Sequence, residues 1–461
     1  MLKISRLTLS CALIFLSVMV FYGSSAAQQH LTGTFADGAT YVIDVPATWN
    51  HKLLLYSHGY TFPGSQNPAY DYGDAYSAYY LLTLGYALAG SSYATTGWAV
   101  QDALPDQIAT LDAFHSLVGT PTQTIAWGAS MGGLITAALV QQYPSRFQGA
   151  LPMCGVVAGG VGFWNEALDA AFAFNILLAN NSLQVVNISD PLTNYNNAEA
   201  FLGAAQGTPQ GQARIALVAA LADVHGWFDP SSPEPAPNDY ASQEYNQFLW
   251  LANTDLLFPF YLRTELEARA GGNPSFNTGV NYQHQLSSSV NHAEVQALYA
   301  AAKLNLNADL TKLKNAQRIA AAPGALTYLS DNIIFNGQIS VPVLSMHTTG
   351  DGLVPVEDEK AYSTAVHEAG NTALLRETFV HRAGHCEFTP AETIAAFEAL
   401  SNRLRLGKWQ GLSSADLNSV ATALGATYNI LDINGTLVHT APAFVSYTPK
   451  QFLRVYDTVT H

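Results

Sequence analysis

The sequence is poor in charged residues, and in basic residues above all. Only 19 lysines and arginines stand against 34 aspartates and glutamates, which gives a formal net charge of −15 at pH 7. Binding of DNA or RNA needs a basic face that neutralises phosphates, so we predict no nucleic-acid partner. Charged residues make up 11% of the 461 residues and aromatic residues another 11%, a composition typical of a folded chain with a polar, mostly uncharged surface.

The common sequence patterns for metal and phosphate binding are also missing. The chain contains neither an HExxH motif nor paired CxxC motifs, and the glycine-rich run 155–162 is not followed by a phosphate-binding signature. We therefore predict that the protein requires neither a metal nor a cofactor.

Long apolar runs are scarce, and the one that stands out is N-terminal. Lys3 and Arg6 precede an apolar stretch over residues 7–22, and small residues up to Ala27 form an A-x-A-like cleavage pattern. We predict a signal peptide over residues 1–27 and a mature protein that is secreted or periplasmic. A membrane anchor is the alternative, but the run is shorter than the ~20 residues of a spanning helix. No stable membrane span is expected after cleavage.

Cysteine is rare as well, with three residues in the chain. Cys11 lies in the predicted signal peptide, so the mature protein keeps Cys154 and Cys386. An even pair in an oxidising compartment permits one disulfide, whereas two buried free thiols are the alternative that the count alone leaves open.

From Thr40 onward, apolar segments of strand length alternate with segments of helical period, which predicts a mostly parallel sheet with helices on both faces. The alternation stops after Cys154 and resumes at Val341, and helical periods fill the interval. The predicted cap helices are 165–178, 212–223, 242–253, 256–270 and 292–303. The predicted strands are 40–45, 52–56, 86–90, 124–127, 150–153, 341–346 and 374–380. The predicted domains are a core of residues 28–155 and 335–405, a mainly helical cap over 156–334, and an appendage over 406–461 packed on the core.

The most specific motif is the segment TIAWGASMGG, residues 124–133, in which Gly128, Ser130 and Gly132 match G-x-S-x-G. The predicted strand before it and helix after it are the context of a nucleophile elbow, where glycines let the two backbones pass closely. The elbow also places the serine at a helix N-terminus, which favours developing negative charge. We predict Ser130 as a nucleophile.

A second loop, after the strand 52–56, contains His58 and Gly59. Acyl transfer turns a carbonyl oxygen into an oxyanion that needs two donors already aimed at it. We assign these donors to the backbone N–H groups of Tyr60 and Met131. For His58 we favour a role in shaping the loop by hydrogen bonding over direct proton transfer.

Asp351 and His385 are the predicted partners of the serine. Asp351 follows a predicted strand in MHTTGDGLVP, and His385 lies in the glycine-containing loop HRAGHCEF. Their chain order, serine then aspartate then histidine, is the order of a Ser-His-Asp triad on a parallel sheet. The alternatives are His381 for the histidine, and Asp358 and Asp331 for the aspartate.

These segments resemble the α/β-hydrolase superfamily in motif and order over residues 52–155 and 341–404. The resemblance implies the α/β-hydrolase fold, with the cap inserted after the strand that follows the nucleophile helix. In tannases and feruloyl esterases of this superfamily, cysteines beside the serine and the histidine tie the two loops together. Cys386 adjoins His385 as in that pattern, but Ala129 stands beside Ser130. Because Cys154 ends the neighbouring strand, we predict a different bridge, between Cys154 and Cys386.

The predicted function is hydrolysis of a carboxylic ester of a small molecule through an acyl-enzyme. Esters need less help for the leaving group than amides, so an amidase or peptidase with the same triad is the alternative. A non-catalytic binding protein on the same scaffold is a further alternative. Six aromatic residues of the cap are expected mainly to form the cap core. If some of them line the pocket instead, they favour an apolar or aromatic group in the substrate. The six are Trp227, Phe228, Trp250, Phe258, Phe260 and Tyr261.

Overall fold

The structure, a computed structural model, describes residues 27–456. Apart from Ala27, the predicted signal peptide lies outside the described residues, so its cleavage stays a prediction. Over residues 27–456, none of the helices combines the length and the apolarity that crossing a bilayer requires.

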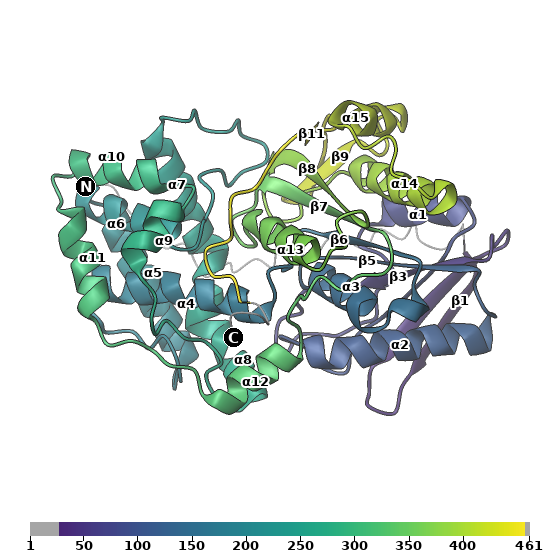
Figure 1. Ribbon diagram of the computed structural model, residues 1–461, viewed down its shortest axis with the longest axis horizontal. Helices are drawn as coiled ribbons and strands as arrows, with labels where there is room; N and C mark the ends of the chain where they lie inside the picture. The colour runs from purple at the N-terminus through teal and green to yellow at the C-terminus, as the bar shows by residue number, and fades with distance from the viewer. Residues whose placement is uncertain (1–26, 457–461) are drawn as a thin grey trace.

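Within these residues, nine strands form one sheet in the order β1-β2-β4-β3-β5-β6-β7-β8-β11 (Figure 1). The six strands from β4 to β8 along this order are parallel, whereas β1, β2 and β11 pair antiparallel at the edges. The strands are β1 (Ala27–Thr34), β2 (Thr40–Pro46), β3 (Lys52–Ser57), β4 (Ala87–Ser91), β5 (Gln123–Ala129), β6 (Gly149–Met153), β7 (Val343–Gly350), β8 (Leu375–Ala383) and β11 (Phe444–Val445). The central strands are buried, as expected when helices cover both faces.

Two sets of helices cover the two faces of the sheet. Helices α2 (Val100–Leu117), α3 (Met131–Gln142) and α13 (Glu357–Glu368) share one apolar core with the strands. Helices α1 (Ala75–Thr83), α14 (Pro390–Leu406) and α15 (Ser414–Ala423) share another on the opposite face. This doubly wound arrangement confirms the predicted α/β-hydrolase fold.

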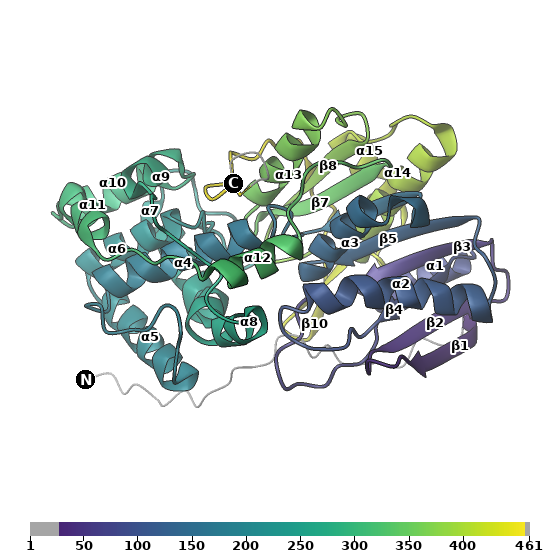
Figure 2. The same cartoon turned by 60° about the horizontal axis from the view of Figure 1, so that its bottom comes forward.

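The chain between β6 and β7 forms a helical lobe beside the sheet (Figures 1 and 2). This cap has its own apolar core, which includes Phe174, Phe260 and Trp250. Its helices are α4 (Gly160–Leu177), α5 (Pro191–Gln206), α6 (Pro209–Ala220), α7 (Tyr240–Trp250), α8 (Arg263–Ala270), α9 (Tyr282–Ser288), α10 (His292–Ala301), α11 (Leu306–Asn315) and α12 (Pro323–Asp331). Two π-helical turns, Leu251–Asp255 and Phe258–Leu262, connect α7 to α8.

Several cap helices were not predicted from the sequence. Helix α5 contains three asparagines, residues of low helix propensity, and packs against α6. Helix α4 begins at Gly160, earlier than the predicted start at Asn165. A Cβ at Gly160 would lie 3.1 Å from Leu329 and 3.3 Å from Trp98, so glycine there permits close packing against α12.

The C-terminal segment contacts both the core and the cap. After the hairpin of β9 (Ile430–Ile433) and β10 (Thr436–His439), β11 extends the sheet beside β8. Arg454 then forms an ion pair with Asp169 of α4, and its guanidinium donates to the Phe276 carbonyl at 2.8 Å. The segment predicted to pack on the core therefore also joins the core to the cap.

A buried ion pair holds the loop between β8 and α14. The Arg382 guanidinium donates to both carboxylate oxygens of Glu392, at 2.6 and 2.9 Å, and to the Glu387 carbonyl at 2.7 Å. Glu392 also completes a capping box with Thr389 at the start of α14. The residues between Arg382 and Glu392 are thereby held at both ends.

We predict that Glu392→Gln lowers the free energy of unfolding by about 3 kcal/mol, because it leaves the Arg382 charge buried without a counter-charge. Urea unfolding followed by circular dichroism measures this loss. Asp112→Asn is the control, since it breaks an arginine–carboxylate pair whose aspartate is 63% exposed, and we expect a change of about 0.5 kcal/mol or less. Equal effects of the two substitutions would contradict the prediction.

Candidate active site

Ser130 lies in the sharp turn between β5 and α3 with φ of 62° and ψ of −129°. This conformation is unusual for a residue with a side chain and is maintained by close packing around it. A Cβ at Gly128 would lie 2.4 Å from the Ser57 carbonyl oxygen, and one at Gly132 would lie 1.9 Å from it. Only glycine fits at both positions, as the elbow motif predicts.

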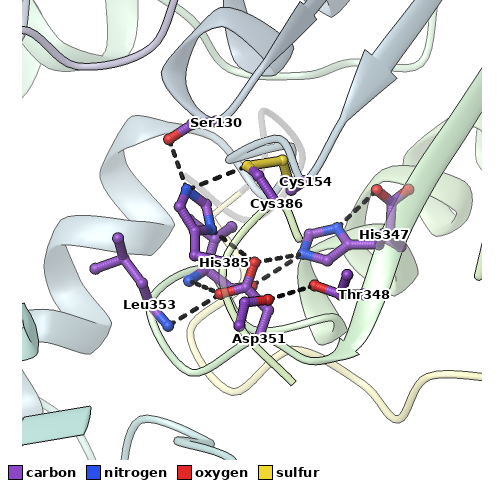
Figure 3. The surroundings of a disulfide bond; sticks show 11 residues. Ser130, Cys154, His347, Thr348, Asp351, Leu353, His385 and Cys386 are labelled. Carbon is purple, nitrogen blue, oxygen red and sulfur yellow. Dashed lines mark hydrogen bonds and ion pairs between the residues drawn. A yellow bond between two sulfur atoms is a disulfide. The ribbon is translucent and has the colours of Figure 1, made fainter. Parts of the chain in front are cut away.

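The predicted serine, histidine and aspartate meet at the carboxyl end of the parallel strands (Figure 3). His385 Nε2 lies 2.8 Å from Ser130 Oγ, and His385 Nδ1 lies 2.7 Å from Asp351 Oδ2. Asp351 directly follows β7, is fully buried, and accepts backbone N–H bonds from Leu353 at 3.1 Å and Val354 at 3.0 Å. A continuous hydrogen-bonded line therefore runs from a buried carboxylate to a serine hydroxyl.

A second buried histidine lies behind Asp351. His347 Nε2 is 3.5 Å from Asp351 Oδ2 and 2.9 Å from the Val354 carbonyl oxygen, and its Nδ1 is 3.0 Å from Glu359 Oε1. The sequence assigns no role to His347, which directly follows the predicted strand 341–346. Residues four apart along an extended strand lie about 13 Å apart, so the spacing of His347 from Asp351 gave no signal that the two side chains meet.

The charges around Asp351 keep it ionised. Burial alone raises the pKa of Asp351, but the His385 and His347 rings outweigh burial and lower this pKa to about 2. Burial alone lowers the pKa of His347, but the Asp351 and Glu359 carboxylates raise it to about 10. His347 is therefore a protonated imidazole between two carboxylates, and Asp351 stays charged at neutral pH.

The three alternative residues do not take part in the hydrogen-bonded line from Asp351 through His385 to Ser130. His381 is 46% exposed at its side chain and pairs with Glu234 at 3.4 Å. Asp358 is buried elsewhere and accepts the Ala158 N–H at 3.0 Å. Asp331 is exposed at the end of α12.

The loop after β3 lies directly against Ser130. A Cβ at Gly59 would be 3.3 Å from Ser130 Cβ, so glycine lets this loop approach the hydroxyl. Met131 is the first residue of α3, and its N–H has no acceptor within the helix. The assignment of the Tyr60 and Met131 amides as oxyanion donors stays a prediction.

His58 holds the shape of the same loop. Its Nδ1 lies 2.8 Å from the Gly59 carbonyl oxygen, its Nε2 lies 3.2 Å from the Ser92 carbonyl oxygen, and its ring stacks on Tyr93 at 4.0 Å. Burial lowers the pKa of His58, while the two carbonyls oppose this shift. These contacts fit the loop-shaping role that the sequence favoured.

Cys154 and Cys386 form a disulfide that closes a separation of 232 residues (Figure 3). Cys154 directly follows β6, the neighbour of β5, and Cys386 directly follows His385. The bridge therefore ties the histidine loop to the sheet beside the serine turn. Within residues 27–456, the convergent set of possible metal ligands is these two sulfurs and His385, and the bonded sulfurs are not thiolates.

Among the aromatic cap residues, some belong to the cap core, one lines a cavity and one is exposed. Phe258 lines a cavity between the cap and the loop after Asp351. Trp250 and Phe260 belong to the cap core, and Tyr261 is exposed. Phe258 also packs on Tyr60, with ring centroids 5.5 Å apart, so the cavity borders the loop beside Ser130.

Residues 89–224 match the model of the prolyl oligopeptidase family. The chain is similar to an o-phthalyl amidase of Xanthobacter agilis, with 28% identity over 428 residues that cover 85% of this chain and 90% of that protein. Among solved structures, it is similar to an esterase from Aspergillus oryzae, with a TM-score of 0.43, 16% identity, and coverage of 83% of this chain and 80% of that chain. It is also similar to feruloyl esterase B from Aspergillus oryzae, with a TM-score of 0.39, 15% identity, and coverage of 83% and 81%.

We predict that the double variant Cys154→Ala, Cys386→Ala lowers the free energy of unfolding by roughly 3–5 kcal/mol, because the bridge closes a long loop. We also expect kcat to fall more than KM changes, because His385 loses a tether while the cavity keeps its walls. Urea unfolding and steady-state kinetics measure the two effects. Mass spectrometry that finds both thiols free in protein purified without reductant would refute the bridge.

Proposed function

We propose that this chain, a member of the α/β-hydrolase superfamily and a serine hydrolase for esters or amides, is exported and cleaves a carboxylic ester through Ser130, His385 and Asp351. The observation that supports these roles is the hydrogen-bonded line from Asp351 through His385 to the Ser130 hydroxyl. An ionised carboxylate on Nδ1 keeps the proton on that nitrogen and leaves Nε2 free to accept the serine proton.

The proposed reaction proceeds in two halves. His385 Nε2 accepts the hydroxyl proton of Ser130 as Oγ attacks the acyl carbon, and the imidazolium then protonates the leaving alcohol. The resulting acyl-enzyme is cleaved by water, which the same imidazole deprotonates. Asp351 stabilises the imidazolium in both halves because its carboxylate stays charged.

The oxyanion formed in each half is assigned to the N–H groups of Tyr60 and Met131. Gly59 brings the first donor close to Ser130, and the N-terminus of α3 presents the second. Removal of one such donor typically costs about 10²–10³-fold in rate. No metal or cofactor enters this scheme.

Amide cleavage with the same residues is the second candidate. The relative from Xanthobacter agilis is named an o-phthalyl amidase and matches 85% of this chain. An amide nitrogen leaves only when it is protonated, so amide cleavage would depend on His385 more strongly than ester cleavage does. Export is proposed on the N-terminal sequence, and the Cys154–Cys386 disulfide is compatible with it.

We expect a fluorophosphonate probe to label the purified protein covalently at Ser130, because the probe reacts with an activated serine. Labelling is expected to disappear in Ser130→Ala and to drop by about 10³-fold or more in rate in His385→Ala, since the base is lost. His381→Ala is the matched control and is expected to label at the wild-type rate. Gel fluorescence measures the labelling. A folded wild-type protein that takes up no label would favour the alternative of a non-catalytic binding protein.

A comparison of 4-nitrophenyl butyrate with butyryl 4-nitroanilide separates esterase from amidase. We expect kcat/KM for the ester to exceed that for the anilide by about 10²-fold or more, because nitrophenolate leaves without prior protonation. Absorbance of the released nitrophenol or nitroaniline gives both rates. Comparable values for the two substrates would make amide hydrolysis the better assignment.

A further inference from the structure

The cavity between the cap and the loop after Asp351 is lined by two carboxyl groups that no proposed catalytic step uses. Glu166, on α4, is 2% exposed, and its Oε1 has no hydrogen-bond partner among residues 27–456. Asp255, in the π-helical turn after α7, has two buried carboxyl oxygens, and neither has a partner in the same part of the chain. Both residues line the cavity. Buried polar groups without partners are uncommon in proteins, and each calls for an explanation.

The remaining wall of the cavity is apolar. Phe163, Leu256, Phe258 and Leu353 are among its residues. Leu353 donates its backbone N–H to Asp351, and Phe258 packs on Tyr60. A group held in the cavity would therefore lie next to both the aspartate loop and the predicted oxyanion loop.

Burial and neighbouring acidic groups make ionisation of both carboxyl groups unfavourable as long as no counter-charge lies beside them. Burial raises the pKa of Glu166 well above its usual range, and Asp223, Asp358 and Glu357 raise it further. Burial likewise raises the pKa of Asp255, and Asp351 adds to this shift. Both groups therefore favour the neutral carboxyl form on their own. A cation bound beside them would favour the ionised form with release of a proton, whereas an anionic group would keep them neutral.

We propose that this cavity binds an ammonium group carried on an apolar stem, which makes a cationic substrate the preferred class for the proposed hydrolase. The ammonium N–H groups would donate to Glu166 Oε1 and to the Asp255 oxygens, and the stem would contact the phenylalanine and leucine side chains. Phenylalanine faces also attract such a cation. The inference rests on the proposed function in one respect, because it treats the cavity as part of the substrate site.

A bare metal ion fits this cavity less well than an organic cation. Metal sites bring several ligand atoms together around one point. Among residues 27–456, the group of three histidine, cysteine, aspartate or glutamate ligand atoms that converge within 4.8 Å is the disulfide pair with His385, not the carboxyl groups of the cavity. An ammonium group needs fewer acceptors than a metal ion does, and its apolar stem would lie on the apolar wall.

Binding can be measured without catalysis. Calorimetry on the full mature chain carrying Ser130→Ala compares benzylammonium with benzyl alcohol and benzoate, which have similar stems and different charges. We expect benzylammonium to bind about tenfold or more tightly than the other two, because charge-assisted hydrogen bonds are the stronger ones. Equal affinities, or a preference for benzoate, would overturn the proposal.

Glu166→Gln and Asp255→Asn test the two carboxyl groups in the same background. Each is expected to weaken benzylammonium binding by about tenfold and to change benzyl alcohol binding by less than about twofold. Glu244→Gln is the matched control, because Glu244 is a cap carboxyl that is 2% exposed, has an unpartnered Oε1 and does not line the cavity. Circular dichroism checks that each variant folds. An ammonium preference that survives in the Glu166→Gln, Asp255→Asn double variant would refute the assignment.

Two further results separate the possible failures. Stabilisation of the protein by calcium chloride, with none by benzylammonium, would identify a metal site and overturn the proposal. An ammonium preference in a wild-type protein that takes up no fluorophosphonate would uphold the cavity and refute the hydrolytic function. A wild-type protein that takes up the fluorophosphonate but shows no preference for benzylammonium would support the hydrolytic function and refute the cation site.

Discussion

The arrangement of the active site depends on one buried carboxylate. Asp351 is fully buried and remains charged, which would be costly without partners. Two backbone N–H groups satisfy one oxygen, and the His385 and His347 rings face the other. Because Asp351 accepts at His385 Nδ1, the other ring nitrogen points its lone pair at Ser130. Asp351 therefore determines which ring nitrogen of His385 faces the Ser130 hydroxyl, although it does not contact Ser130 itself.

The histidine loop has little regular structure, and covalent and ionic contacts hold it. The disulfide ties Cys386 to the end of β6, and Arg382 bonds both Glu392 and the Glu387 carbonyl. These contacts lie on the two sides of His385. They reduce the conformations open to the loop and so keep the imidazole within reach of the serine hydroxyl.

The cap contributes differently from the core. Its own apolar core gives it a stable form, while the cavity that it lines beside the aspartate loop includes carboxyl oxygens with no hydrogen-bond partner in the described part of the chain. The C-terminal segment joins the two parts through the ion pair between Arg454 and Asp169. A pocket between two such parts can vary in its lining while the serine, histidine and aspartate stay on the sheet.

The amino-acid sequence by itself determined the features that depend on local backbone chemistry. The strands and helices of the core follow from apolar period, and the Ser130 turn follows from glycines that only a tight strand-to-helix bend requires. The order of Ser130, Asp351 and His385 then predicted which side chains would meet. Only the tertiary structure decided the contacts between segments far apart in the chain. These include the ring of His347 behind Asp351, the pairing of Arg382 with Glu392, and the placing of Glu166 and Asp255 on the wall of one cavity. Such contacts leave no periodic trace, because packing rather than local propensity brings their residues together.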